Sequence, residues 1–200
     1  LINYSHSHTL YLLDKYKNGA VCDRDRMTYT LQCLFNALAV IPSVDMGFID
    51  NHDLVLSGDG SALHIHSSVY GHKIADDDNG KPLYRYSAPD ADIGWDSNLE
   101  CFFLGYTLYN ISYHNPFKSI DLPVFIDIER ASQHDALTTI SASARFFDIC
   151  EDLHPKYICF DSASDSLPIF QFFRQMHIIP IIDRNQRNSG NNPFEKYNLS

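Results

Sequence analysis

Positive charge, long apolar runs and paired cysteines are all scarce in this sequence, and each scarcity excludes a class of protein. Lysine and arginine number 15 against 25 aspartates and glutamates, so the net charge of −10 provides no global positive field to attract nucleic acid or an acidic membrane. No apolar stretch approaches the ~20 residues that span a bilayer. The five cysteines are scattered and form no C-x-x-C pair, which argues against a disulfide frame or a thiolate zinc site and for reduced thiols inside a cell.

The length and the apolar content of the chain favour one soluble globular domain. Its 200 residues, 44% of them apolar, are enough to build a real core. The sequence starts at Leu1 without a methionine and stops at Ser200 after an Asn- and Gly-rich stretch, so we expect a fragment that is open at both ends. We expect a helical N-terminal segment over residues 1–50 and one α/β domain over residues 51–200 that is incomplete at its C-terminus.

One helical pattern dominates the N-terminal segment. Between Arg24 and Val40, apolar residues recur at steps of three and four, which predicts a helix with one buried stripe that ends before Pro42. The stripe consists of Met27, Leu31, Leu34, Leu38 and Val40. Ser43 is then expected to cap a short second turn.

The stretch Leu54 to Ser61, LVLSGDGS, is the most informative part of the sequence. Its apolar run predicts a buried strand that ends at Asp59, a carboxylate between two glycines. Glycine on both sides lets the backbone approach a bound group closely, which suits a metal site. The alternative is that Asp59 only opens a turn after the strand, as Asp beside Gly often does.

The rest of the pattern alternates strands with helices after one long connection. Residues 71–100 predict a loop of functional length that holds Trp95, the only tryptophan, which either anchors the loop or stacks on a nucleic-acid base. The elements predicted after it are strands over 101–112 and 122–128, a helix over 132–153 with a capping box at Ser132, a strand over 157–160, a helix over 167–177 and an edge strand over 178–182.

The order of these elements brings two acids together. Three strands in succession form a meander, and the crossover helix must then lay the strand over 157–160, which runs into Asp161, parallel to the strand that ends at Asp59. Neighbouring strands lie about 4.8 Å apart, so the two carboxylates would meet at the rim of the sheet. Carboxylates this close repel unless a proton or a cation lies between them, and Asp oxygens suit Mg²⁺ or Mn²⁺. Paired ions about 4 Å apart are the usual device for in-line attack at phosphate.

This arrangement resembles the ribonuclease H-like fold, a mixed five-stranded sheet flanked by helices, and the motifs resemble the DDE-type transposases of bacterial insertion sequences. The matching segments are SGDGS at 57–61, YRYSAPDADIGWDS followed by FFLGYTLY, and FDSASDSLPIFQFFRQMHIIPIIDRNQRN. The resemblance implies that Asp59 and Asp161 are the first two metal-binding acids and hold two Mg²⁺ or Mn²⁺ ions. It also implies cleavage of DNA at the ends of an insertion sequence and strand transfer to target DNA, by a homodimer assembled on DNA in the cytoplasm, at the nucleoid.

The third acid of the family's triad, a Glu on a helix after the last strand, is not evident. Glu195 lies 34 residues past Asp161, a spacing seen in some members, but its surroundings indicate a loop. We therefore expect the missing Glu after Ser200, and we expect this fragment alone to be inactive. Candidate DNA contacts are Trp95, Arg184 and Arg187.

Two other function classes stay open. The first is a ribonuclease H-like nuclease with the same acids and no strand transfer, which only the joining step distinguishes from a transposase. The second is a zinc-binding or non-catalytic remnant of a mobile element, for which the pairs His6/His8 and His64/His66 are the argument. In a strand, positions i and i+2 share a face, so His64 and His66 could reach one ion, although no third ligand lies nearby in the sequence.

Overall fold

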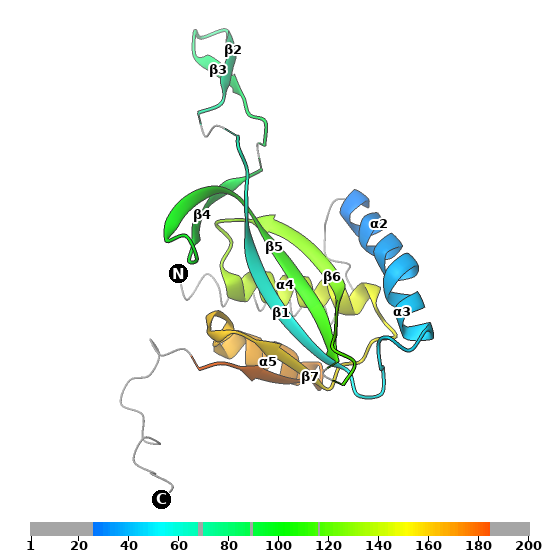
Figure 1. Cartoon of the computed structure of the whole chain (residues 1–200). Coiled ribbons are helices and arrows are strands. Elements are labelled where there is room, and N and C mark those ends of the chain that lie inside the picture. The colour runs from blue at the N-terminus through cyan, green and yellow to red at the C-terminus, as the bar shows by residue number, and fades with distance from the viewer. Residues whose placement is uncertain (1–25, 68–69, 89, 116, 185–200) are drawn as a thin grey trace, which may run out of the picture.

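The computed structural model describes residues 26–67, 70–88, 90–115 and 117–184, and they form an α/β structure. Figure 1 shows a mixed sheet with helices packed against it and a hairpin, β2–β3, that projects from one end. The helical elements are α2 (Arg26–Phe35), the π-helical turn η1 (Asn36–Val40), α3 (Ile41–Asp45), α4 (Asp135–Ile149), the 3-10 turn η2 (Ser162–Ser164) and α5 (Leu167–Gln175). The strands are β1 (Val55–His64), β2 (His72–Asp76), β3 (Pro82–Arg85), β4 (Asp92–Asp96), β5 (Cys101–Asn115), β6 (Ile120–Arg130), β7 (Tyr157–Phe160) and β8 (Ile179–Ile182). Searching the described helices for a membrane span finds none long and apolar enough to cross a bilayer.

The main sheet has six strands of mixed orientation. Strands β6, β5, β1, β7 and β8 lie side by side in that order, and β4 pairs with the first residues of β5. The neighbours β6, β5 and β1 are antiparallel, whereas β1, β7 and β8 are parallel. The predicted meander and the predicted parallel pairing are therefore confirmed, and Pro180 lies in the edge strand β8. The prediction of five strands was wrong because it missed β4.

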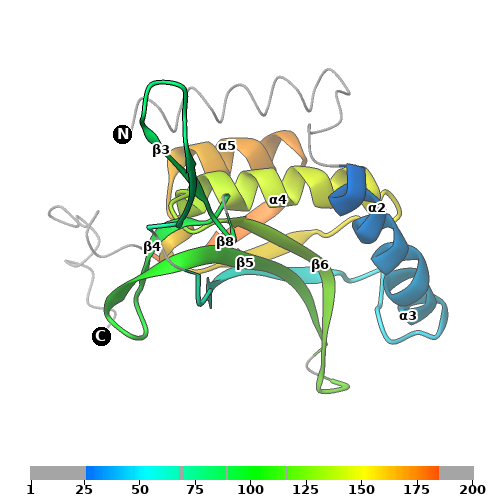
Figure 2. The same cartoon turned by 90° about the horizontal axis from the view of Figure 1, so that it is seen from above.

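The hydrophobic core lies between the sheet and two helices. Figure 2 shows α4 and α5 on the same side of the sheet. Strand alternation turns Leu56 of β1 toward these helices, where it is buried, and leaves Ser57 exposed on the opposite face. The other large, fully buried side chains are Tyr113, Phe125, Phe146, Phe172, Phe173, Leu54, Ile111, Ile140, Ile158, Ile169 and Val124.

The predicted loop over residues 71–100 contains three strands instead. β2 and β3 form a hairpin whose turn is closed by Asp77, because its carboxylate accepts hydrogen bonds from the backbone N–H groups of Asn79 and Lys81. Gly80 supplies the positive φ of this turn. β4 then pairs antiparallel with the start of β5. β2 and β3 were not predicted because all their residues are exposed, so no alternation of apolar and polar residues marks them in the sequence.

The sequence predicted that the N-terminal helix ends before Pro42, and this prediction was wrong. The helical backbone continues through η1 into α3, and Pro42 occupies the first turn of α3, where the missing N–H group costs little. Ser43 donates its hydroxyl proton to the carbonyl of Ala39 instead of capping a new helix. The helix thus continues past a proline that would otherwise break it, because the turn before Pro42 is π-helical.

The face of this helix that meets the core shares only Val40 with the predicted stripe among the residues whose side chains are described. Three residues pack against the core, namely Phe35, Val40 and Val44. Three residues of the predicted stripe are exposed instead, namely Leu31, Leu34 and Leu38. Asn36 fixes the orientation, because its side-chain amide donates to the carbonyl of Ile149 at the end of α4 over 3.1 Å.

Helix α4 begins at Asp135, later than predicted, and a different residue caps it. The ring nitrogen Nδ1 of His134 accepts a hydrogen bond from the backbone N–H of Ala136 at 3.2 Å. Ser132, the predicted cap, donates instead to the carboxylate of Asp92 at 2.6 Å. Asp135 therefore stands in the first turn of α4, directly after its cap.

Candidate functional site

The parallel pair β1 and β7 determines where Asp59 and Asp161 lie. Gly58 is level with Phe160, so Asp59 and Asp161, each one residue further along, are level as well. The backbone of Asp161 is still extended, with φ −75° and ψ 176°. Neighbouring strands lie about 4.8 Å apart, and side chains at the same level point to the same face of the sheet. The structure therefore brings the two predicted acids next to each other at the C-terminal end of β7.

Each of the two carboxylates makes one backbone hydrogen bond. Asp59 accepts from the N–H group of Gly60 at 2.8 Å, and Asp161 accepts from the N–H group of Ala163 at 3.2 Å. Both residues are exposed. Within the described ranges each acid therefore keeps its second oxygen for water or a cation.

A third acid, Asp135, lies within electrostatic reach of this pair. Its pKa is raised above the ordinary value of 3.8, chiefly because the surrounding protein removes part of its hydration. The charges of Asp161 and Asp59 raise this pKa further, while His134 opposes the rise. Asp135 still contacts solvent, which screens the repulsion. The sequence analysis treated this residue only as part of a capping box, because nothing local shows that the first turn of α4 approaches the end of β7.

A hydroxyl chain lies on the helix side of the sheet, within electrostatic reach of the three acids. The buried Tyr109 of β5 donates to the hydroxyl of Thr139 on α4 at 3.1 Å, and Thr139 shares a 3.4 Å hydrogen bond with Ser164. Burial raises the pKa of Tyr109 strongly, and the charges of Asp59, Asp161 and Asp135 add to this rise. Tyr109 is therefore a neutral hydrogen-bond donor that ties the sheet, α4 and η2 together below the acids.

Gly58 is required by packing at the same place. A Cβ atom at this position would lie 2.5 Å from Cε1 of Phe160 and 2.6 Å from the hydroxyl oxygen of Tyr109. The sequence analysis attributed the glycines beside Asp59 to close approach of a bound group. For Gly58 the close neighbours are side chains of the protein itself, so this residue sets the spacing of β1, β5 and β7 under Asp59.

The carboxylates fit part of a metal site. Asp59 and Asp161 offer oxygen ligands, which Mg²⁺ and Mn²⁺ prefer. As placed, the described residues include no set of three His, Cys, Asp or Glu side chains close enough to hold one ion. By alternation Asp59 shares the face of Ser57, whereas Asp135 belongs to the helix that covers the other face, so the third acid approaches from a different side.

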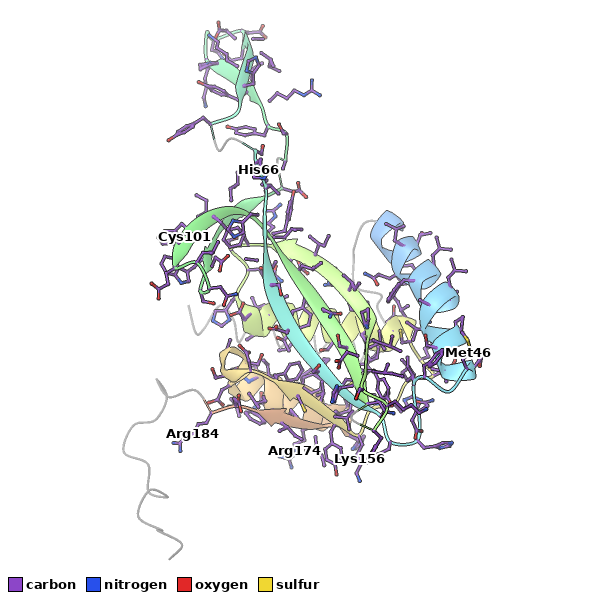
Figure 3. The ribbon with its side chains drawn as sticks, viewed as in Figure 1. Met46, His66, Cys101, Lys156, Arg174 and Arg184 are labelled. Atoms are coloured by element: carbon purple, nitrogen blue, oxygen red, sulfur yellow. The ribbon has the colours of Figure 1, made fainter. Side chains whose placement is uncertain are left out.

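Of the histidine pair proposed as a zinc site, His64 has partners of another kind. His64 forms a 2.7 Å hydrogen bond with Asp96 and stacks on Phe103 with ring centroids 4.5 Å apart. This hydrogen bond is the main reason that the pKa of Asp96 lies below its ordinary value. His66 lies at the base of the projecting hairpin (Figure 3). His64 thus serves the packing of β4 on β1 and β5, while His6 and His8 lie outside the described residues.

Of the predicted DNA contacts that the structure describes, Trp95 lies far from the acids and Arg184 lies at the same end of the sheet as Asp161. Trp95 lies on β4 with its ring against Phe102, at 4.9 Å between centroids, and both are exposed. Along β5, the partner of Trp95 is eight residues from Asn110, the partner of Asp59, or on the order of 27 Å at the usual rise per residue. Arg184 is exposed just past β8 (Figure 3), and because Ile182 of β8 is level with Phe160 of β7, it lies at the end of the sheet where Asp161 follows β7. Arg187 and Glu195 lie outside the described residues.

Comparisons of the chain with models of protein families, with curated proteins and with solved structures found no match. The argument for function therefore rests on the acids themselves and on the sheet that holds them.

Proposed function

We propose that this chain is the ribonuclease H-like core of a DDE-type transposase of an insertion sequence, which cleaves DNA strands and joins them to a target. The observation that supports this proposal most directly is that β1 and β7 present Asp59 and Asp161 at the same level. The order of strands and helices supports it as well. An antiparallel meander of β1, β5 and β6 is followed by α4, the parallel strand β7, α5 and β8, which is the order on which the resemblance in sequence rests.

In this proposal the protein supplies position and charge. Asp59 and Asp161 would hold two Mg²⁺ or Mn²⁺ ions through the oxygens that their backbone hydrogen bonds leave available. Bound ions of this kind activate water and stabilise the charge that develops on a phosphate. The hydroxyl chain from Tyr109 fixes the strands below the acids, so they need little reorganisation when a substrate binds. No residue of the chain acts as a covalent nucleophile in this scheme.

The partners follow from the same proposal. The substrates are the ends of an insertion sequence and a target DNA, and two copies act together when assembled on DNA in the cytoplasm. Trp95, Arg184 and Arg187 remain candidate DNA contacts, and Glu195 or a Glu after Ser200 remains the candidate third acid of the triad.

Asp135 favours a second candidate, a nuclease of the same fold without strand transfer. The expectation that this fragment is inactive rested on the absence of a third carboxylate near the first two. Asp135 feels the charges of both Asp161 and Asp59, although it approaches them from the helix side of the sheet, so a set of three requires it to move toward them. A site of Asp59, Asp161 and Asp135 would be complete within these 200 residues.

The test is a plasmid-nicking assay with a separate measurement of metal binding. Supercoiled plasmid is incubated with the chain and Mn²⁺, and joining is followed with a labelled oligonucleotide duplex. Asp59→Asn and Asp161→Asn should each abolish nicking and weaken Mn²⁺ binding, measured by calorimetry, at least tenfold. Asp53→Asn is the matched control, because Asp53 is an exposed acid that precedes β1.

The outcomes separate the candidates. Nicking and joining that both require Asp59 support the transposase, whereas nicking that requires Asp135 and is never followed by joining supports the nuclease. If the chain shows no nicking, Mn²⁺ binding that depends on Asp59 and Asp161 supports the shared site. Mn²⁺ affinity that is the same in both variants and in the control would remove the basis of either function.

A further inference from the structure

Two cysteines that are far apart in the sequence meet where α2 crosses the end of α4. Cys33 lies on α2 and is partly buried, whereas Cys150 follows the last residue of α4 and is buried. Both are free thiols. Figure 2 shows the C-terminal end of α4 against α2, so the packing of the two helices brings the cysteines to one place.

The side chain of Asn36 shows how closely the two helices meet. Its amide group donates to the carbonyl of Ile149 at 3.1 Å, and its Oδ1 atom accepts a hydrogen bond from the Cys150 thiol at 3.4 Å. Cys33 precedes Asn36 by three residues, or one helical turn, so the two side chains are neighbours on one face, with Cβ atoms about 5–6 Å apart. The thiols of Cys33 and Cys150 therefore both lie beside Asn36.

Tyr29, one turn before Cys33, extends the same contact. The pKa of Tyr29 is raised first by Cys33, through its charge and a hydrogen bond, and then by loss of hydration and by the charges of Asp148 and Glu151 near the end of α4. Burial raises the pKa of the Cys150 thiol to about 12, and the charge of Cys33 adds to this rise. Cys33 and Cys150 thus lie within electrostatic reach of each other.

We propose that Cys33 and Cys150 form a reversible disulfide that joins α2 to the C-terminal end of α4, with a small disulfide such as oxidised glutathione as the oxidant. A disulfide needs Cβ atoms about 3.8 Å apart, so pairing requires the Cys150 sulfur to turn from Asn36 toward Cys33. Asn36 keeps its hydrogen bond to Ile149 and so holds the two helices in place during this turn.

The burial of the two thiols determines the order of the steps. Cys33 is only partly buried, so it loses its proton to water and attacks glutathione disulfide first, which forms a mixed disulfide and releases one glutathione thiolate. Cys150 then loses its proton, attacks the sulfur of Cys33 and expels the second glutathione thiolate. Both thiolates take up a proton. Two protein thiols and one glutathione disulfide thus become one protein disulfide and two glutathione thiols, and reduced glutathione reverses both steps.

The bond acts on the helix that carries Asp135. α4 runs from Asp135 to Ile149, so joining its C-terminal end to α2 restrains the helix whose other end approaches the acids. A disulfide also removes conformational freedom from the unfolded chain, and it does so most when it closes a long loop. We therefore expect oxidation to raise the melting temperature by about 5 °C or more, and dithiothreitol to return it to its starting value.

The test is oxidation of the folded chain, followed by mapping of its cysteines. The whole chain is incubated with oxidised glutathione without denaturant, the remaining thiols are blocked with N-ethylmaleimide, and unreduced peptides are analysed by mass spectrometry. The expected product is a pair of peptides joined through Cys33 and Cys150, which dithiothreitol separates. Cys101 is exposed and should carry glutathione instead, which shows that the reagent has acted.

Serine variants separate the two steps. Cys150→Ser should stop at the mixed disulfide, with glutathione on Cys33 and without the rise in melting temperature. Cys33→Ser should leave Cys150 unmodified, because glutathione does not reach a buried thiol. Cys159→Ser is the matched control, since Cys159 lies on the strand β7, and this variant should form the bond as the unmodified chain does.

Three results would overturn the inference. The first is glutathione on Cys101 without any peptide pair joined through Cys33 and Cys150. The second is a bond from Cys33 to Cys22 or Cys101 instead. The third is a bond between Cys33 and Cys150 that forms only in urea, because the folded helices would then hold the two thiols apart.

Discussion

At the scale of single residues, the ionised form of Asp135 is disfavoured by its surroundings. Loss of hydration raises the pKa of Asp135, and the charges of the level neighbours Asp59 and Asp161 raise it further. A group whose pKa is raised on folding is bound more tightly to its proton in the folded state. The folded protein therefore loses some stability as the pH rises through the pKa of Asp135 and this side chain ionises.

We expect Asp135→Asn to raise the melting temperature at pH 7. The amide cannot ionise, so it removes the repulsion from Asp161 and Asp59, and the gain should be small because Asp135 still contacts solvent. Well below pH 3.8 the native side chain is already neutral, so the variant should show no advantage there. Melting curves by circular dichroism at both pH values make the comparison.

The same variant reports on metal binding. Millimolar Mn²⁺ at pH 7 should raise the melting temperature of the unmodified chain more than that of Asp135→Asn if Asp135 contributes to the shell of an ion. Asp53→Asn is the control and should match the unmodified chain in each condition. A lower melting temperature of Asp135→Asn at pH 7 would contradict the repulsion between the three acids.

At the scale of elements, a buried ionic cluster joins α4 to β6. The guanidinium of Arg145 contacts Asp127, lies 2.9 Å from an oxygen of Glu129 and donates to Ser141 at 2.6 Å. Asp127 and Glu129 are buried positions of β6. Because α4 carries Asp135 at one end, this cluster also fixes the helix that brings the third acid to the site.

We expect Arg145→Met to lower the free energy of unfolding by about 3–5 kcal/mol, because it leaves two buried carboxylates without their cation. Urea titration followed by circular dichroism measures the loss. Arg174→Met, at an exposed position of α5, should change stability by no more than about 0.5 kcal/mol.

A second variant keeps this prediction specific. Replacing Asp127 and Glu129 by leucine in the Arg145→Met background should recover most of the stability, because apolar groups need no partner. If Arg145→Met is as stable as the unmodified chain, the cluster does not hold α4 to β6.

At the scale of the whole molecule, the charge of −10 limits how this chain meets DNA. Phosphate contacts from lysine and arginine supply most non-specific affinity, and the net charge here opposes it. We expect binding to random duplex DNA to be weaker than micromolar at physiological salt. Fluorescence anisotropy with a labelled duplex measures it, and a steep loss of affinity with added salt, typical of many phosphate contacts, should not appear. Sub-micromolar affinity would show that a local basic surface overcomes the global charge.

The sequence by itself determined five strands of the main sheet, but not β2, β3 or β4, and it determined the two acids that follow β7 and interrupt β1. Tyr157–Phe160 was predicted with the bounds that the structure shows, because a short apolar run between Pro155 and Asp161 leaves no other choice. The pairing of this strand with β1 followed from the rules for crossovers, so Asp59 and Asp161 could be placed side by side before any coordinates. Both inferences use information that is local or that the order of elements supplies.

Only the tertiary structure decided which faces are covered and which distant residues meet. The three- and four-residue steps over residues 24–40 predicted a helix correctly, but a period of 3.6 marks an apolar face without stating what lies against it. Phe35, Val40 and Val44 pack against the core, whereas Leu31, Leu34 and Leu38 are exposed. For the same physical reason the sequence could not predict that Asp135 lies near Asp59 and Asp161. This proximity depends on how α4 packs across the sheet, and no pattern near Asp135 in the chain indicates it.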